Sequence, residues 1–292
     1  MCGFAGYIDF NQKSSKKELI KMNDVIQYRG PDAADYYVKE KDNYKIGLGH
    51  RRLSIIDLNE SSNQPMLYKD LVIVFNGEIY NYKEIKKELL GLGRTFSTKS
   101  DTEVILQSYD EWEEDCVHKF IGMFSFLILD KEKEEIIAFR DRPGVKPFHY
   151  YWHNNIFLFA SEIKSFHEHS QFVKELNYDA IPQFIQYGHI PTPNSIFKNV
   201  KKLESGSLLK FNFSTKNIEI KKYWNVDDYY KKPKLKISFE EAKKQTEELL
   251  KSACNYRMVS DVPVGVFLSG GYDSTLVTSL LQATSSQKIK TF

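Results

Sequence analysis

The sequence is poor in cysteine and lacks any long apolar run. Its three cysteines, Cys2, Cys116 and Cys254, are too few and too scattered for a disulfide framework, and no CxxC pair offers a zinc site. We therefore expect a reducing, cytoplasmic environment. No apolar stretch approaches the roughly 18 residues of a membrane span, and the N-terminus lacks the basic and apolar regions of a signal peptide. These absences argue against a membrane protein and against a disulfide-rich secreted protein.

An excess of charge of either sign is also lacking. Lys and Arg total 41 and Asp and Glu total 39, which leaves a net charge of +2. This balance gives no case for a nucleic-acid or membrane partner, and small or neutral substrates remain open. Apolar residues make up 41% and charged residues 27%, close to globular averages, so the composition does not suggest disorder.

The length of 292 residues predicts about two domains. The charged stretch Lys231-Lys232-Pro233-Lys234 is typical of an exposed linker. We therefore place a first domain at residues 2–213, a linker at 214–236 and a second domain at 237–292. Apolar runs in the first domain predict strands, at residues 4–10, 71–75, 123–130, 136–139, 157–160 and 207–213.

The first three residues, Met1-Cys2-Gly3, carry the first candidate for chemistry. Removal of Met1 would leave a thiol and a free α-amino group on Cys2. A thiol attacks as its thiolate, and a neutral α-amine, with a pKa of about 7.7 to 8.0, is able to accept the thiol proton near neutral pH. The alternative is an ordinary buried cysteine beside a start methionine.

Arginines mark the next two motifs. A capping box from Ser15 to Glu18 opens a helix that stops before Arg29-Gly30-Pro31-Asp32, where Arg29 is either part of a turn or a buried structural cation. Arg51 and Arg52 lie between apolar runs, so at least one of them is expected to point into the fold and to need an anion there. The candidate anion is a ligand carboxylate.

Two further motifs each allow a structural and a functional interpretation. Asn76-Gly77 between apolar runs is a strong hairpin pattern, and the alternative is a pair of donors for a developing oxyanion. Ser100 to Glu103 resembles another capping box, which places Asp101 at a helix start. Asp101 then either stabilises the helix N-terminus or pairs with a substrate ammonium group.

Other charged segments are expected to be solvated. The charge-dense turn at residues 140–147 is typical of a surface loop. His167 and His169 are also predicted to lie at the surface, and without a third ligand nearby we assign them no metal.

The second domain begins with a helix from Ser238 to about Arg257, followed by a strand at residues 262–268. A glycine loop at residues 269–275 then leads into another helix. Strand, glycine loop and helix form an arrangement that cradles phosphate, because helix N–H groups face the anion. The loop is not a Walker A motif, and the alternative is a plain strand-to-helix turn.

Together these motifs resemble the glutamine-dependent asparagine synthetase family, and they occur in that family's order along essentially the whole chain. The motifs that carry the resemblance are Met1-Cys2-Gly3, Arg29-Gly30-Pro31-Asp32, Gly49-His50-Arg51-Arg52-Leu53-Ser54-Ile55, Asn76-Gly77-Glu78-Ile79-Tyr80-Asn81, Ser100-Asp101-Thr102-Glu103 and Ser269-Gly270-Gly271. The resemblance implies an α+β fold. It consists of an N-terminal-nucleophile αββα sandwich of two antiparallel sheets, followed by the beginning of an α/β nucleotide-binding domain.

The resemblance also implies roles for individual residues. Cys2 would attack the glutamine side-chain amide, form a thioester and release ammonia, with Asn76 and Gly77 as the oxyanion hole. Arg52 would hold the substrate carboxylate, and Asp101 with Glu78 would hold its ammonium group. The residues lining the same strand beside glutamine would be Leu53, Ser54, Ile55 and Ile56.

The glycine loop resembles the pyrophosphate loop of ATP pyrophosphatases. The residues implied in ATP binding are Leu268, Ser269, Gly270, Gly271, Asp273 and Ser274. There the family activates aspartate as an acyl-adenylate, with Mg²⁺ bound mostly through phosphate oxygens. Because few residues follow Ser238, we expect the chain to lack most of the synthetase domain.

The implied activity is that of a glutamine-hydrolysing asparagine synthase, with glutamine, aspartate and ATP as its substrates. One alternative is an amidotransferase that passes ammonia to another carboxylate. Another is a non-catalytic regulatory module that keeps the glutaminase fold. A homodimer is among the assemblies that the resemblance allows.

Overall fold

The computed structural model describes residues 2–292, which divide into two compact units. The first unit runs to Ser54 and continues through Asn59–Asn225. The second unit comprises Ile55–Leu58 and Val226–Phe292. The division after Asn225 falls inside the segment that the sequence predicted to be a linker.

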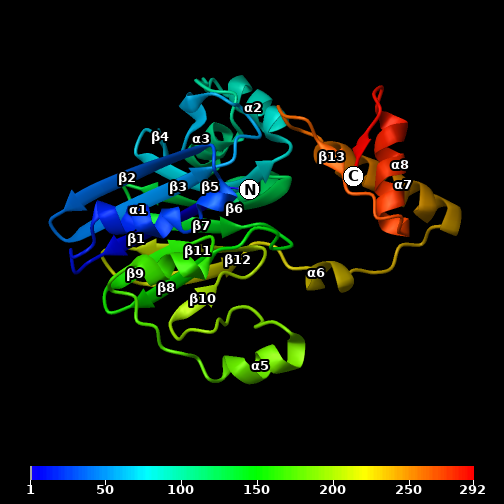
Figure 1. Ribbon diagram of the computed structural model, residues 1–292. Helices are drawn as coiled ribbons and strands as arrows, with labels where there is room; N and C mark the ends of the chain where they lie inside the picture. The colour runs from blue at the N-terminus through cyan, green and yellow to red at the C-terminus, as the bar shows by residue number, and fades with distance from the viewer. Residues whose placement is uncertain (1) are drawn as a thin grey trace. The chain divides into compact units, whose positions relative to one another are not determined.

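Two antiparallel sheets of six strands each form the first unit (Figure 1). The strands of the first sheet are β1 (Gly3–Asp9), β2 (Ala33–Lys41), β3 (Tyr44–Arg52), β8 (His149–His153), β9 (Ile156–Ala160) and β10 (Val200–Lys202). The strands of the second sheet are β4 (Met66–Tyr68), β5 (Leu71–Ile79), β6 (Gly122–Asp130), β7 (Glu135–Arg140), β11 (Ser207–Asn212) and β12 (Ile218–Lys222). Their orders are β10-β8-β9-β1-β3-β2 and β12-β11-β7-β6-β5-β4. The predicted pair of antiparallel sheets is confirmed.

Helices complete the first unit. Its α-helices are α1 (Lys16–Asp24), α2 (Tyr82–Gly91), α3 (Asp101–Trp112), α4 (Cys116–Lys119) and α5 (Ala180–Tyr187). Its short 3-10 segments are Gln27–Arg29, Glu60–Ser62, Glu113–Asp115 and Ile163–Glu168. Helix α1 packs on the outer face of the first sheet, where Leu19 and Met22 join a fully buried apolar cluster with Ala5 and Tyr7.

Strand β1 is buried on both faces, which explains its unbroken apolar sequence. Successive side chains of a strand point to opposite faces. Phe4 and Ile8 therefore enter the core between the two sheets, whereas Ala5 and Tyr7 face α1. Burying a side chain as large as Phe4 contributes about 1.5 to 3 kcal/mol. Burial on both faces holds β1 in place, and Cys2 directly precedes this strand.

The predicted capping boxes have different outcomes. At α1 the Ser15 hydroxyl accepts from the Glu18 N–H, and the Glu18 carboxylate accepts from the Ser15 N–H, so the box is confirmed. At α3 the Ser100 hydroxyl does cap the helix. The second half of that box is wrong, because the Glu103 carboxylate turns to the N–H groups of residues 97 and 98.

The hairpin expected at Asn76-Gly77 is wrong. Strand β5 continues through both residues, with Asn76 opposite Ser125 and Gly77 opposite Phe124 in β6. A Cβ atom on Gly77 would overlap the carbonyl oxygen of Met123. The glycine at this position therefore permits close approach of two strands and does not form a turn.

The loop at residues 140–147 is partly buried and not solvated throughout as predicted: Asp141 and Lys146 are buried, whereas Val145 is exposed. The Asp141 carboxylate is fully buried and accepts from the N–H groups of Phe124, Val145 and Lys146, at 3.2, 2.8 and 2.9 Å. The Arg140 guanidinium donates to the carbonyls of Gly144 and Lys146, both at 2.9 Å. Backbone groups thus replace water around these charges, which allows the loop to enter the fold.

The surface placement of His169 is wrong as well, whereas His167 is exposed. His169 is only 3% exposed, and its Nε2 lies 2.9 Å from the Ser14 hydroxyl. That hydroxyl in turn donates to the buried Asp9 carboxylate at 2.7 Å. A polar network accounts for the burial of this histidine.

The second unit contains α6 (Asp227–Tyr230), α7 (Phe239–Tyr256) and α8 (Tyr272–Thr284). The Ser238 hydroxyl caps α7 as predicted, by accepting the Glu241 N–H at 3.2 Å. The strand predicted at residues 262–268 is shorter than expected: β13 spans only Gly265–Val266. It pairs in parallel with β14 (Lys290–Thr291).

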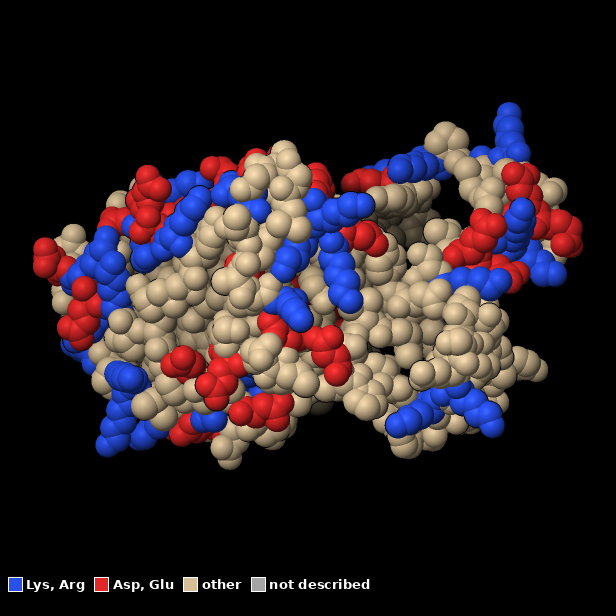
Figure 2. All heavy atoms as spheres, turned by 90° about the horizontal axis from the view of Figure 1, so that it is seen from above, with Lys and Arg blue, Asp and Glu red and all other residues tan. Residues whose placement is uncertain are grey.

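The surface carries both signs of charge. Among the described residues on the face shown in Figure 2, basic and acidic side chains lie interspersed, as the net charge of +2 leads one to expect. Within residues 2–292, none of the helices is long and apolar enough to cross a membrane.

The buried Asp141 carboxylate provides a test of the fold. Replacing Asp141 by Ala leaves three backbone N–H groups without their acceptor, and each buried unsatisfied group costs about 1 to 3 kcal/mol. We expect Asp141→Ala to lower the free energy of unfolding by at least about 3 kcal/mol in urea titrations, with Asp141→Asn less affected. A change within about 0.5 kcal/mol of wild type, which is typical of a solvated loop, would contradict this account.

Candidate active site

Cys2 lies directly before β1, where Gly3 pairs with Arg51 of β3. The Leu53 N–H donates to the Cys2 Sγ at 3.3 Å. Burial raises the pKa of the Cys2 thiol, and the hydrogen bond from Leu53 opposes that rise. The thiol therefore needs a base to become a nucleophile. Met1 lies outside the described residues, so its removal and the α-amine mechanism stay predictions.

The sequence left two alternatives for Arg29, a turn residue or a buried cation, and its side chain proves to be largely buried. The guanidinium binds the backbone of Cys2. Its Nε donates to the Cys2 carbonyl at 3.0 Å, and its Nη1 pairs with Glu162 at 2.7 Å. Only 10% of the Arg29 side chain is exposed. A Cβ atom on Gly3 would lie 3.1 Å from the Arg29 Cδ, so the glycine leaves room for this contact.

Arg51 and Arg52 diverge as adjacent residues of a strand must. Arg51 forms an ion pair with Asp24. Arg52 is buried, and its Nη1 donates to the Asn59 carbonyl and to the Asn63 side-chain oxygen, both at 2.8 Å. The positive charge of Arg52 also lowers the pKa of the Cys2 thiol, so its guanidinium lies within electrostatic reach of the sulfur.

Two acidic side chains of the site, Asp101 and Glu78, carry the charge opposite to that of Arg52. Asp101, the first residue of α3, accepts the Ile79 N–H at 3.0 Å. Burial, together with the neighbouring charge of Glu78, raises the pKa of Asp101 to about 7 in spite of that hydrogen bond. Burial raises the pKa of Glu78 as well, while Lys146 lowers it. A substrate ammonium group would relieve the repulsion between the two carboxylates.

The Asn76 side chain is buried, and neither its Nδ2 nor its Oδ1 has a hydrogen-bond partner within residues 2–292. Buried amides are nearly always hydrogen-bonded, because an unmade bond costs about 1 to 3 kcal/mol. An amide left without a partner at the edge of a site is therefore suited to a ligand or to a developing charge.

The backbone of β5 supplies a second donor beside Asn76. In an antiparallel pair, alternate residues direct their N–H groups away from the partner strand. The Phe75 N–H donates to Gln64 Oε1 at 2.7 Å, and the Ile79 N–H donates to Asp101, both away from β6. Gly77 lies midway between these two residues. Its N–H consequently points to the same edge of β5.

The structure thus gathers most of the site residues that the sequence predicted. They come from the start of β1, the end of β3, the end of β5 and the first residue of α3. These residues are Cys2, Arg52, Leu53, Asn76, Gly77, Glu78 and Asp101. Ser54 also belongs to the first unit, and its N–H donates to the Asp32 carboxylate at 2.8 Å. Ile55 and Ile56 fall in the second unit, so their place beside a substrate stays a prediction.

Lys146 was not predicted. It is only 3% exposed, and its ammonium lies within electrostatic reach of Glu78 and Cys2. Burial lowers the pKa of Lys146, whereas Glu78 raises it. No sequence pattern marked this residue, because a charge-dense turn usually predicts solvent exposure.

The glycine loop of the second unit follows β13 and ends at the N-terminus of α8, as predicted. Gly270 has a φ of +78°, a conformation that favours glycine, and nothing lies within 4 Å of where its Cβ would be. The Ser269 and Ser274 hydroxyls lie 3.0 Å apart across the loop. This open backbone at a helix start fits a phosphate group. Among residues 2–292, no group of three or more His, Cys, Asp and Glu side chains is arranged to hold a metal.

Comparison with known proteins finds two family models that match different parts of the chain. Residues 1–224 match the model of the glutamine amidotransferase domain, and residues 245–292 match that of asparagine synthase. A putative asparagine synthetase [glutamine-hydrolyzing] 2 of Methanocaldococcus jannaschii is 43% identical over all of this chain and 59% of its own length. Asparagine synthetase [glutamine-hydrolyzing] 3 of Bacillus subtilis is 37% identical over 96% of this chain and 45% of its own length. The chain therefore spans about half the length of the curated relatives it matches.

Among solved structures, a glutamine phosphoribosylpyrophosphate amidotransferase from B. subtilis with ADP and GMP matches all of this chain and 65% of its own, with a TM-score of 0.57. At 16% identity this likeness concerns the fold alone. The family model covers most of the chain, including Cys2, Asn76 and Asp101. The chain belongs to the family of glutamine amidotransferase domains.

Proposed function

We propose that the protein is a glutamine-hydrolysing asparagine synthase: Cys2 releases ammonia from glutamine, and the ammonia amidates aspartate. The observation that carries this proposal is the Asn76 amide without a partner, beside the outward-pointing Gly77 N–H of β5. Two such donors on β5, in the unit that also carries Cys2, Arg52 and Asp101, suit the hydrolysis of an amino-acid amide.

Opposite charges would orient the substrate. The glutamine carboxylate pairs with Arg52, and its ammonium group pairs with Asp101 and Glu78. Leu53 and Ser54, together with Ile55 and Ile56, line the side chain. Binding at both ends of the α-carbon fixes the direction of the amide and brings it within attacking distance of the sulfur.

The chemical step transfers the acyl group to sulfur. The Cys2 Sγ attacks the side-chain carbonyl carbon, and the oxyanion that forms accepts hydrogen bonds from Asn76 Nδ2 and the Gly77 N–H. The α-amine of Cys2, freed by loss of Met1, takes the thiol proton and passes it to the leaving nitrogen. Ammonia departs as the C–N bond breaks, and water then hydrolyses the thioester to glutamate.

The second unit would bind ATP. The loop residues proposed to hold its phosphates are Ser269, Gly270, Gly271, Asp273 and Ser274, with Leu268 near the adenosine. ATP, with Mg²⁺ on its phosphate oxygens, would activate the aspartate β-carboxylate by adenylation. The open backbone at Gly270 and the adjoining start of α8 support this assignment.

A cytoplasmic location completes the proposal. All three cysteines are free thiols, as expected in a reducing compartment. Assembly as a homodimer stays a prediction.

The nucleophile is tested by removing the thiol. We expect the purified chain to release ammonia from glutamine and Cys2→Ala to abolish the release, because no other group forms the thioester. Cys254→Ala, which removes a thiol of the second unit, serves as the control and keeps the activity. Intact-mass data that show Met1 retained in active protein would overturn the α-amine mechanism.

The buried Asp101 predicts a pH dependence. Burial holds the pKa of Asp101 near 7, so the carboxyl becomes neutral as pH falls through that value and ceases to pair with the substrate ammonium. We expect kcat/KM for glutamine to fall below pH 7, since this ratio reports the free enzyme. Asp101→Asn should lower kcat/KM roughly tenfold to a hundredfold at pH 8. The fall in kcat/KM below pH 7 should also disappear in this variant. If kcat/KM of Asp101→Asn still fell below pH 7, the pH dependence would belong to another ionisable group.

The phosphate loop is tested by aspartate-dependent exchange between ATP and pyrophosphate. The assay uses the chain extended by the remainder of an asparagine synthase region. Gly270→Val should abolish the exchange, because valine does not readily adopt a φ of +78°, while glutamine hydrolysis persists. Undiminished exchange in Gly270→Val would exclude this loop as the ATP site.

A further inference from the structure

We propose that Gln64 and His50 are positioning residues for the oxyanion hole. They hydrogen-bond to the carbonyl and the N–H of Phe75 and thereby hold Asn76 and Gly77 where the oxyanion forms. This role rests on the proposed hydrolysis of glutamine. Neither residue contacts the reacting atoms in the mechanism above, so their effect acts through β5.

Gln64 joins β5 to the start of α3. Its side chain is almost fully buried; Oε1 accepts the Phe75 N–H at 2.7 Å, and Nε2 donates to the Thr102 hydroxyl at 3.1 Å. Thr102 follows Asp101 directly in the first turn of α3. One amide therefore links the oxyanion strand to the helix that carries the proposed ammonium-binding carboxylate.

His50 binds the carbonyl group of the same residue. Its ring is fully buried, and its Nε2 lies 2.9 Å from the Phe75 carbonyl oxygen. Because a carbonyl only accepts, Nε2 carries the hydrogen. Burial lowers the pKa of His50 to about 4, so the ring is neutral at physiological pH. The contact connects β3, which also carries Arg52, to the strand of the oxyanion donors.

The hydrogen bonds of Gln64 and His50 are needed because the pairing of β5 with β4 ends at Ile73. Strand β4 begins at Met66, opposite Ile73, so from Phe75 onward none of the strands within residues 2–292 pairs with that edge. Side chains fix the edge instead: Gln64 holds the Phe75 N–H, and Asp101 holds the Ile79 N–H. The oxyanion donors lie between these two anchors.

Small displacements of this segment would slow the reaction. Oxyanion donors act at about 2.7 to 3.1 Å from the developing charge, and a shift of about 1 Å costs up to a hundredfold in rate. Substrate binding uses Arg52 and Asp101 and does not use the oxyanion donors before the attack. A loosened Phe75 should therefore lower kcat and leave KM nearly unchanged.

The experiment compares Gln64→Met and His50→Leu with wild type. We expect kcat for ammonia release from glutamine to fall roughly tenfold to a hundredfold in each, with KM changed less than about twofold. Alkylation of Cys2 by iodoacetamide should keep its rate, because displacement of iodide forms no oxyanion. His50→Gln, which retains an N–H donor, should recover part of the lost kcat.

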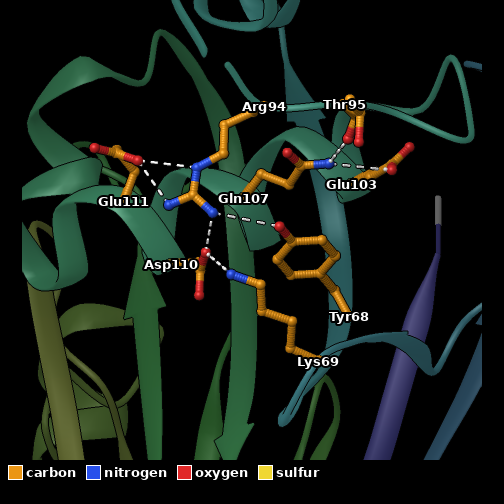
Figure 3. A network of polar contacts seen from close by, with 8 residues as sticks. All are labelled: Tyr68, Lys69, Arg94, Thr95, Glu103, Gln107, Asp110 and Glu111. Atoms are coloured by element: carbon orange, nitrogen blue, oxygen red, sulfur yellow. Dashed lines mark hydrogen bonds and ion pairs between the residues drawn. The ribbon is translucent and has the colours of Figure 1, made fainter. Parts of the chain in front are cut away.

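Gln107 provides a matched control (Figure 3). It is a fully buried glutamine of α3 that donates to the Thr95 carbonyl at 2.6 Å and to the Glu103 carboxylate at 3.2 Å. None of its hydrogen bonds reaches β5. Gln107→Met removes the same kind of buried amide, so a comparable loss of stability is expected while kcat keeps its wild-type value.

The outcomes separate the positioning role from the function on which it rests. Unchanged kcat in Gln64→Met and His50→Leu, with Cys2→Ala inactive, would overturn the positioning role alone. A parallel loss of kcat and alkylation rate, or an equal loss of kcat in Gln107→Met, would show a general structural effect and overturn it too. Hydrolysis that persists in Cys2→Ala would overturn the proposed function, and the positioning role with it.

Discussion

The site depends on strand β5, which pairs with a neighbouring strand along the whole of one edge but along only the beginning of the other. Strand β5 pairs with β6 over its whole length, but β4 covers just its first three residues. Buried backbone N–H groups must still be satisfied, and side chains provide for this at Phe75 and Ile79. The Gly77 N–H lies between them and is one of the two donors that we propose for the oxyanion hole. In this proposal the oxyanion hole arises where the pairing of β5 with β4 has ended.

Burial acts on four ionisable side chains around Cys2, Cys2 itself included, in the direction that disfavours their charge. It raises the pKa of Cys2, Asp101 and Glu78, and it lowers the pKa of Lys146. A bound amino acid would bring an ammonium group and a carboxylate to this region. Each would stabilise side chains of the opposite charge that are partly or fully shielded from water. The same burial keeps the thiol protonated, so binding alone does not activate it. A base near the sulfur is required, and in the proposed mechanism the α-amine of Cys2 has that role.

Features fixed by neighbouring residues could be predicted from the sequence. The capping serines Ser15 and Ser238 are confirmed because a cap involves only the next few residues. The turn at Asn76-Gly77 was wrong because pairing with β6, some 50 residues away, overrides the local preference. The same applies to Asp141 and His169, whose burial depends on partners from other elements. The residues of the site were found through family motifs, and their individual roles stay predictions.

Gln64 shows why part of a site escapes sequence analysis altogether. A glutamine before a proline carries no pattern of its own, and its importance arises only from the acceptor and donor it meets in β5 and α3. Cys2 and Asp101, in contrast, can be recognised by residue type, because few other side chains supply a nucleophile or a negative charge. Residues that react are therefore easier to predict than residues that hold them in place. The second group sets the distances on which oxyanion stabilisation depends, so it belongs to the description of the site as much as the first.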